Sequence, residues 1–240
     1  MLLTREERKA LIVTARRAVG PSVPLMCGVG AHSTAQTIEF ISDAAAAGAN
    51  SVLVLPSAYF GVCNGVDLSS DFIEAMAKRH SNIVGVELTC GSVAIITRLA
   101  AALPREKFAV FGGQADFILG GLVSGSSGCV AAFANVAPLC VVRINDLYHQ
   151  GKLSEAFALH QKTALAEQAI KGGTAPTKCA AAIHNATYAC IQNAPARMAP
   201  RRPYVAPTAA FQEMLKSRTE EVGEIERCLP LICRSISSKI

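Results

Sequence analysis

Short apolar runs rich in β-branched residues recur as far as Gly151, and each is followed by a stretch with helical spacing. These runs are 23–27, 51–55, 83–88, 108–111 and 128–133. Buried parallel strands have such continuous apolar patterns, and their alternation with helices is typical of βαβ units. The pattern therefore predicts an α/β fold with about five parallel strands in its first part.

Helical spacing continues without strands from residue 152 to residue 240. Helices are expected over 154–169, 177–192 and 209–227, and a segment containing Pro and Arg separates the last two. We therefore predict an α/β domain over 1–151 and a C-terminal helical extension over 152–240.

The alternation is interrupted once. Thr4 and Glu7 form a capping box before a helix that reaches residue 19, and Ser33 or Thr34 caps a second helix over 36–47. After Pro56, a connection to the next parallel strand requires about a dozen residues that include a helix. Instead, 57–67 has the pattern of a loop and leads into a helix over 70–80. An element pair is therefore expected to be missing between Gly61 and Val62.

The composition and the charge of the chain argue against several classes of function. Hydrophobic residues make up 51% of the chain, the net charge is +5, and no basic stripe alternates with aromatic residues. The high hydrophobic content argues against a disordered chain, and the charge pattern argues against nucleic-acid binding. The uncharged runs 44–66 and 117–142 are interrupted by Gly, Asn and Pro, which indicates buried core and no membrane association. The His residues share no metal-ligand spacing and Gly28-Val29-Gly30 lacks a third glycine, so no metal or cofactor is expected.

Cysteine usage bears on the compartment. The nine Cys form no CxxC pair, and the first residues, MLLTREERKA, have no secretory signal pattern. The sequence therefore predicts reduced thiols and a cytoplasmic location.

The candidate chemistry lies in IVGVELTCG, residues 83–91. Glu87 is a carboxylate in an apolar strand, near the end that faces the ligand-binding crevice of α/β folds. NIVGVELTCGS resembles the sixth-strand signature of the dihydrodipicolinate synthase and N-acetylneuraminate lyase family of class I aldolases. FGGQADF and SGSSGCVAAFANVAP resemble its seventh and eighth strands. RRPYVAP resembles fungal members, which include aldolases for 2-keto-3-deoxy sugar acids and 4-hydroxy-2-oxoglutarate.

The resemblance implies an incomplete TIM (β/α)8 barrel, with about five of the eight strands, before the helical extension. In the family, a lysine on the sixth strand forms a Schiff base with pyruvate or another 2-oxo acid, and Glu87 occupies its position. The first two strands would precede Met1, and the fifth, with a proton-shuttling tyrosine, would lie between Gly61 and Val62. A carboxylate cannot form an imine, so the resemblance implies a lyase relative that is inactive or impaired.

A remnant of the pocket is expected at five further positions. Thr89, Gly113, Gln114 and Val130 match substrate-contacting positions, and Tyr59 matches a tyrosine that relays protons. Several of them also have structural interpretations: strand packing for Thr89 and Val130, a strand-to-helix turn for Gly113, and a loop aromatic for Tyr59.

No other lysine is expected to supply the amine, because Lys107 precedes its strand and Lys171 and Lys178 lie in the helical extension. Two alternatives stay open: a non-catalytic subunit that associates with an intact paralogue, and an incomplete gene product of an active aldolase. The expected partners are a 2-oxo acid such as pyruvate as ligand, and further copies of this chain or a paralogue.

Overall fold

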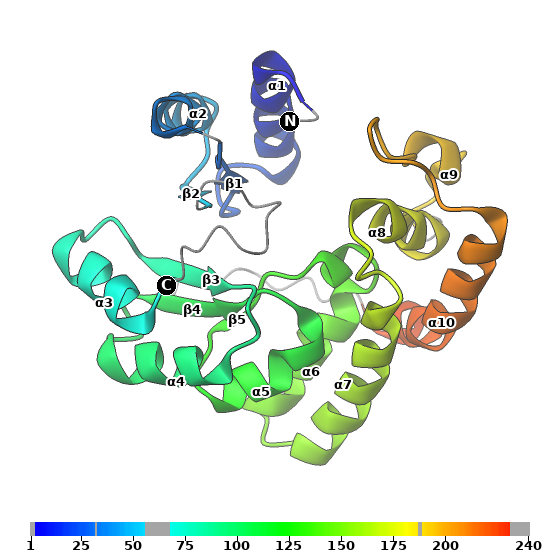
Figure 1. Ribbon diagram of the computed structural model, residues 1–240. Coiled ribbons are helices and arrows are strands. Elements are labelled where there is room, and N and C mark those ends of the chain that lie inside the picture. Colours follow the sequence, from blue (N-terminus) through cyan, green and yellow to red (C-terminus); the bar gives the residue numbers. More distant parts are fainter. Residues whose placement is uncertain (1–2, 32, 56–67, 187–188, 231–240) are drawn as a thin grey trace. The chain divides into compact units, whose positions relative to one another are not determined.

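The computed structural model describes residues 3–31, 33–55, 68–186 and 189–230 (Figure 1). The described residues form two compact units, one up to residue 55 and the other from residue 68. Both contain parallel strands and helices in alternation. The predicted α/β class is therefore confirmed.

The first unit has two helices and two strands: α1 (Arg5–Val19), β1 (Met26–Gly28), α2 (Thr34–Ala46) and β2 (Ser51–Leu53). Strands β1 and β2 pair in parallel, with Met26 opposite Ser51. The side chain of Thr4 accepts a hydrogen bond from the Glu7 N–H, and Ser33 accepts one from the Gln36 N–H, so both predicted caps are confirmed.

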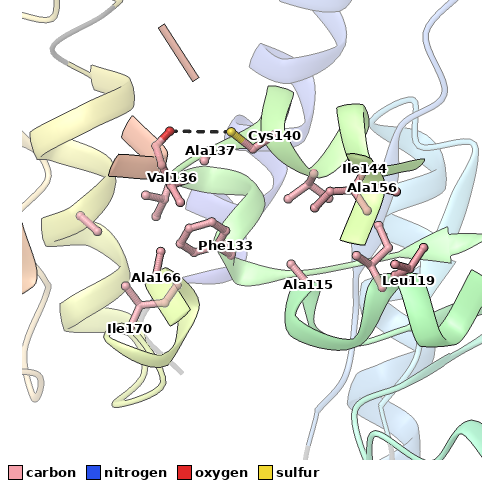
Figure 2. Close-up of a cluster of buried hydrophobic side chains, with 14 of the residues drawn as sticks. Ala115, Leu119, Phe133, Val136, Ala137, Cys140, Ile144, Ala156, Ala166 and Ile170 are labelled. Atoms are coloured by element: carbon pink, nitrogen blue, oxygen red, sulfur yellow. Dashed lines mark hydrogen bonds between the residues drawn. The ribbon is translucent and has the colours of Figure 1, made fainter. Parts of the chain in front are cut away.

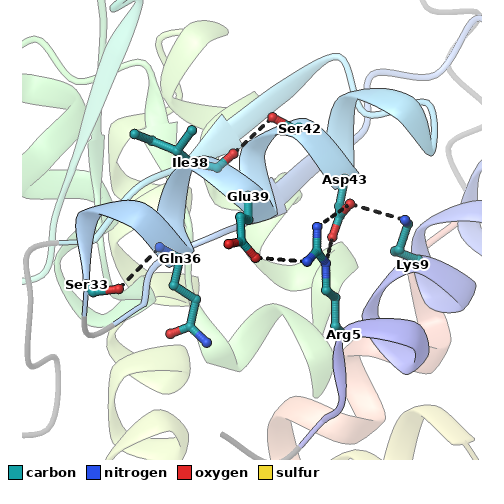
Figure 3. Close-up of polar contacts among 8 residues, drawn as sticks. All are labelled: Arg5, Lys9, Ser33, Gln36, Ile38, Glu39, Ser42 and Asp43. Atoms are coloured by element: carbon teal, nitrogen blue, oxygen red, sulfur yellow. Dashed lines mark hydrogen bonds and ion pairs between the residues drawn. The ribbon is translucent and has the colours of Figure 1, made fainter.

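Helices α1 and α2 are joined by ion pairs (Figure 3). Arg5 Nε lies 2.5 Å from Asp43 Oδ2 and Arg5 Nη1 lies 2.8 Å from Glu39 Oε2, while Lys9 Nζ lies 3.1 Å from Asp43 Oδ1. The hydrogen bond from Arg5 lowers the pKa of Asp43 to about 2. Phe40 of α2 is buried in a small apolar cluster with Val29 and Ala44.

The second unit begins with strands and helices in alternation. Its elements are α3 (Ser70–Arg79), β3 (Gly85–Leu88), α4 (Val93–Ala102), β4 (Ala109–Gly112), the 3-10 turn η1 (Ala115–Phe117), α5 (Ile118–Val123), β5 (Gly128–Cys129), the 3-10 turn η2 (Ala132–Asn135) and α6 (Pro138–His149). The parallel sheet has the order β3-β4-β5. Ile73 of α3 and Leu99 of α4 pack against Leu88 and Val110, so these helices cover one face of the sheet.

The remaining elements are helical: α7 (Leu153–Gln168), α8 (Thr174–Ala181), the π-helix η3 (Ala182–Ala186), α9 (Ala194–Arg197) and α10 (Ala209–Cys228). Helices α7, α8 and α10 share one core with α5 and α6, in which Phe133, Ile144 and Ala166 are buried (Figure 2). Leu215 of α10 belongs to the same core, whereas residues of η3 and α9 form a small cluster of their own. The shared core contains side chains from both sides of residue 151. The division into 1–151 and 152–240 stays a prediction.

Five strands are present in the described residues, in two separate parallel sheets of two and three strands. Gly61 and Val62, where a missing element pair is expected, lie outside the described residues. Within those residues, no helix has both the length and the apolar character needed to cross a membrane.

Candidate functional site

Glu87 and Thr89 meet at the C-terminal end of β3. They are two residues apart and therefore share one face of the strand, and Thr89 Oγ1 donates a hydrogen bond of 2.8 Å to Glu87 Oε1. Leu88 between them is buried under the helices that cover the opposite face. Glu87 is half-buried and Thr89 is exposed. The carboxylate is thus fixed by the strand and by a neighbouring hydroxyl, on the face away from α3 and α4.

Gly113 follows β4 and closes this site from the neighbouring strand. Its N–H donates to Leu88 O at 3.0 Å. A Cβ at this position would lie 2.6 Å from Thr89 Cα and 2.9 Å from Thr89 Oγ1, and would also contact Glu87 Oε1. The close approach of the two chains therefore requires glycine here.

Of the other predicted site residues, only some lie next to Glu87. Gln114 Nε2 lies 3.5 Å from Thr89 O, so Gln114 adjoins the site. Val130 belongs to the same sheet edge, because its N–H donates to Gly112 O at 2.8 Å, but its side chain is 41% exposed. Tyr59 lies outside the described residues. The structure thus brings Glu87, Thr89, Gly113 and Gln114 together.

Lys171 also reaches this site, which its position in the helical extension gave no reason to expect. Its Nζ lies 2.6 Å from Gln114 Oε1 and forms an ion pair with Asp116. The contact joins residues 57 positions apart in the chain, so no local sequence signal could have found it. Lys171 Nζ is therefore held by two side chains of the segment that follows β4.

Glu167 of α7 lies behind the same loop. It is 3% exposed, and its Oε1 accepts a hydrogen bond of 3.2 Å from the Ala115 N–H. Burial raises the pKa of Glu167. Burial, with a smaller contribution from the charge of Glu167, raises the pKa of the Cys129 thiol on β5 to about 11. Cys129 pairs with Gly112, which pairs with Leu88, so its side chain lies on the face of the sheet opposite to Glu87.

The arrangement therefore offers a carboxylate, a hydroxyl, a carboxamide and an ion-paired ammonium. Such groups can bind an oxygen-rich ligand and exchange protons with it, but none is a free amine. In the part of the chain that the structure describes, no three His, Cys, Asp or Glu residues stand together as a metal site.

Comparison with known proteins identifies relatives of the whole chain. The model of the dihydrodipicolinate synthetase family matches residues 1–62 and 60–220. A Coccidioides immitis protein, provisionally named a mitochondrial 4-hydroxy-2-oxoglutarate aldolase, is 51% identical over 255 residues, covering 94% of this chain and 81% of its own. An Emericella nidulans protein, also provisionally named a mitochondrial 4-hydroxy-2-oxoglutarate aldolase, is 36% identical over 262 residues, with 95% and 81% covered.

Solved structures of the same family resemble this chain as well. A crystal structure of a protein provisionally assigned to the dihydrodipicolinate synthase family, from Coccidioides immitis, superposes with a TM-score of 0.89 at 49% identity, covering 95% of this chain and 82% of the other. YagE from E. coli K12, crystallised in complex with pyruvate, superposes with a TM-score of 0.78 at 23% identity, covering 92% and 82%. The second likeness concerns the fold, which in these neighbours is a TIM barrel.

The predicted cytoplasmic location is contradicted by these comparisons, since both fungal relatives are named mitochondrial proteins. The prediction rested on reduced thiols and on the absence of a secretory pattern. Those features argue against an oxidising compartment, but they do not distinguish one reducing compartment from another.

Proposed function

The chain belongs to the dihydrodipicolinate synthetase family, and from this we propose that it is a member that binds a 2-oxo acid such as pyruvate but cannot form the Schiff base. Glu87 carries the proposal. It occupies the position of the family's lysine within intact flanking sequence, and Thr89 hydrogen-bonds its carboxylate. Imine formation needs an unprotonated amine, which a carboxylate cannot replace.

We also propose that the barrel is incomplete and lacks an internal segment. The family match falls into two stretches, 1–62 and 60–220, which meet where an element pair is expected to be missing. The alignment with the Coccidioides relative runs over 255 residues, more than the 240 of this chain, so the relative has residues that find no counterpart here. By the family resemblance, the missing segment would carry the proton-shuttling tyrosine.

Location and partners follow from the relatives. Their names support a mitochondrial location. The fragmentary sheet supports association with further copies of the chain or with an intact paralogue, because open strand edges favour pairing with another chain. A purely structural subunit of such a paralogue is the alternative function.

The test is pyruvate release from 4-hydroxy-2-oxoglutarate and from 3-deoxy-hexylosonate by the wild type and by Glu87→Lys. We expect no turnover by either. Glu87→Lys restores an amine but not the tyrosine, and a positioned acid–base group contributes about 10²–10⁴-fold to the rate. Glu106→Lys, which changes an exposed carboxylate outside the site, is the matched control. Turnover by the wild type would contradict the proposal, and turnover by Glu87→Lys alone would show that the rest of the pocket is complete.

A further inference from the structure

Three consecutive residues of the loop after β4 are bound by α7 and the turn that follows it. Lys171 Nζ lies 2.6 Å from Gln114 Oε1, Glu167 Oε1 accepts the Ala115 N–H at 3.2 Å, and Lys171 pairs with Asp116. Glu167 lies near the end of α7, and Lys171 lies in the turn that follows it. The helical part of the chain therefore determines the position of the loop that borders Glu87.

Lys171 also determines which way the Gln114 carboxamide points. An ammonium group has three donors and no acceptor, so it binds the amide oxygen and not the NH2 group. With the oxygen bound by Lys171, Nε2 lies on the opposite side of the carboxamide, 3.5 Å from Thr89 O. With a neutral side chain at position 171, only the 3.5 Å contact of Nε2 with Thr89 O would favour this orientation, and the carboxamide would be held less firmly.

Within the described ranges of the chain, the NH2 group of Gln114 keeps one N–H bond without a partner. A primary amide has two N–H bonds, and the contact with Thr89 O uses one of them at most. Thr89 Oγ1 donates to Glu87 in turn, so the end of β3 is lined by an acceptor carboxylate and by this amide donor. A ligand oxygen at this point would meet the Gln114 donor while the carboxamide keeps the orientation that Lys171 and Thr89 O give it.

We propose that Lys171 is a positioning residue of the site, which orients Gln114 so that its NH2 group donates a hydrogen bond to an oxygen of the bound ligand. The proposal rests on the proposed function, in that the ligand is a 2-oxo acid. Lys171 itself takes no chemical step in this proposal, because its Nζ is held by Gln114 and Asp116.

The experiment observes the side-chain NH2 resonances of Gln114 in ¹⁵N-labelled protein, assigned by their loss in Gln114→Ala, with and without pyruvate. The variants are Lys171→Met, Lys171→Arg, which keeps a charged donor, and Lys162→Met. Lys162 is the matched control, because this lysine of α7 likewise pairs with a carboxylate, Glu221 at 2.7 Å, away from the site. If Lys171→Met does not fold, Lys171→Gln, which stays polar without a charge, replaces it.

We expect the Gln114 NH2 resonances to shift or broaden in Lys171→Met, and to keep their wild-type positions in Lys171→Arg and Lys162→Met. Pyruvate should bind Lys171→Met about three- to tenfold more weakly than the wild type, the effect of one hydrogen bond. Unchanged Gln114 resonances in Lys171→Met would overturn the proposal. Should pyruvate shift no resonance of the wild type, the proposed function fails, whereas the Gln114 resonances still decide the role of Lys171.

Discussion

Glu87 carries a charge whose removal should leave β3 intact. Its side chain lies on the face away from the helices, and its hydrogen bond to Thr89 needs only an acceptor oxygen. An incoming 2-oxo acid brings a second negative charge, and two such charges about 4 Å apart repel by about 4 kcal/mol at an effective dielectric constant near 20.

Glu87→Gln should therefore raise the affinity for pyruvate, by about tenfold or more after allowance for the partial exposure of Glu87 to solvent. Titration calorimetry measures the change, with Glu106→Gln as the control outside the site. Equal affinities of the wild type and Glu87→Gln would mean that pyruvate does not approach this carboxylate.

Asp43 makes the stability of the first unit depend on pH. Its pKa is lowered to about 2 in the folded state, chiefly by the hydrogen bond from Arg5, against about 3.9 in an unfolded chain. The contribution of ionised Asp43 to the free energy of unfolding is therefore fully present above about pH 4 and is lost as the pH falls toward 2. In urea unfolding followed by circular dichroism, Asp43→Asn should lack this part of the acid-induced loss, while Glu6→Gln should keep it. Parallel pH curves for the wild type and Asp43→Asn would contradict this assignment.

Single residues were predictable from sequence where their partners are close in the chain. Thr4 and Ser33 cap helices through contacts three residues away, and both are confirmed. Gly113 and Gln114 were expected near Glu87 because the family resemblance places them at substrate-contacting positions. Lys171 was not, because its contact with Gln114 depends on how α7 packs, which the local pattern does not encode.

At the scale of elements, α7 and α10 each supply a buried glutamate to a helix or turn that begins elsewhere. Glu226 of α10 accepts hydrogen bonds from the Leu139 and Cys140 N–H groups, both at 2.8 Å, at the start of α6. Glu167 of α7 accepts one from Ala115, and its second oxygen has no partner among the described residues. Both carboxylates accept hydrogen bonds from backbone N–H groups, but both oxygens of Glu226 have such a partner and only one oxygen of Glu167 has one among the described residues.

The same substitution should consequently have different effects at the two sites. Glu226→Gln places an NH2 group against one of two N–H donors and should lower the free energy of unfolding by about 1–3 kcal/mol. Glu167→Gln should become less destabilising, or turn stabilising, as the pH rises from about 4.5 to 7. The reason is that the raised pKa of Glu167 makes its folded form bind the proton more tightly than the unfolded chain does. Urea unfolding at several pH values measures both, and an effect of Glu167→Gln that does not change with pH would contradict the account.

The sequence predicted which segments are helices better than it predicted where each helix ends. The helix expected over 209–227 is α10, Ala209–Cys228. The helix expected over 177–192 is instead α8 followed by the π-helix η3. In η3 the ring of His184 contacts Thr219 and packs against Gly223 of α10, where a Cβ would lie 2.6 Å from its Cε1 atom. That packing partner is distant in sequence, so periodicity could not indicate it.

For the whole molecule, the interruption of the βαβ alternation after Pro56 was the most informative sequence feature. The family match is divided at the same point, between 1–62 and 60–220. Closure of a barrel, in contrast, depends on strands that pair across the whole chain, and neither pattern nor composition reports such pairing. Self-association stays a prediction for the same reason.

The central claim is that this chain forms no imine with a 2-oxo acid, because Glu87 stands where other members of the family have the lysine that forms it. Incubation of the purified chain with pyruvate and sodium borohydride, followed by intact-mass measurement and peptide mapping, tests it most directly. A pyruvate-derived mass increase on an intact family aldolase, treated in parallel, shows that the trapping works. We expect the mass of this chain to remain unchanged. A trapped pyruvate on any lysine, above all on Lys171, would contradict the account.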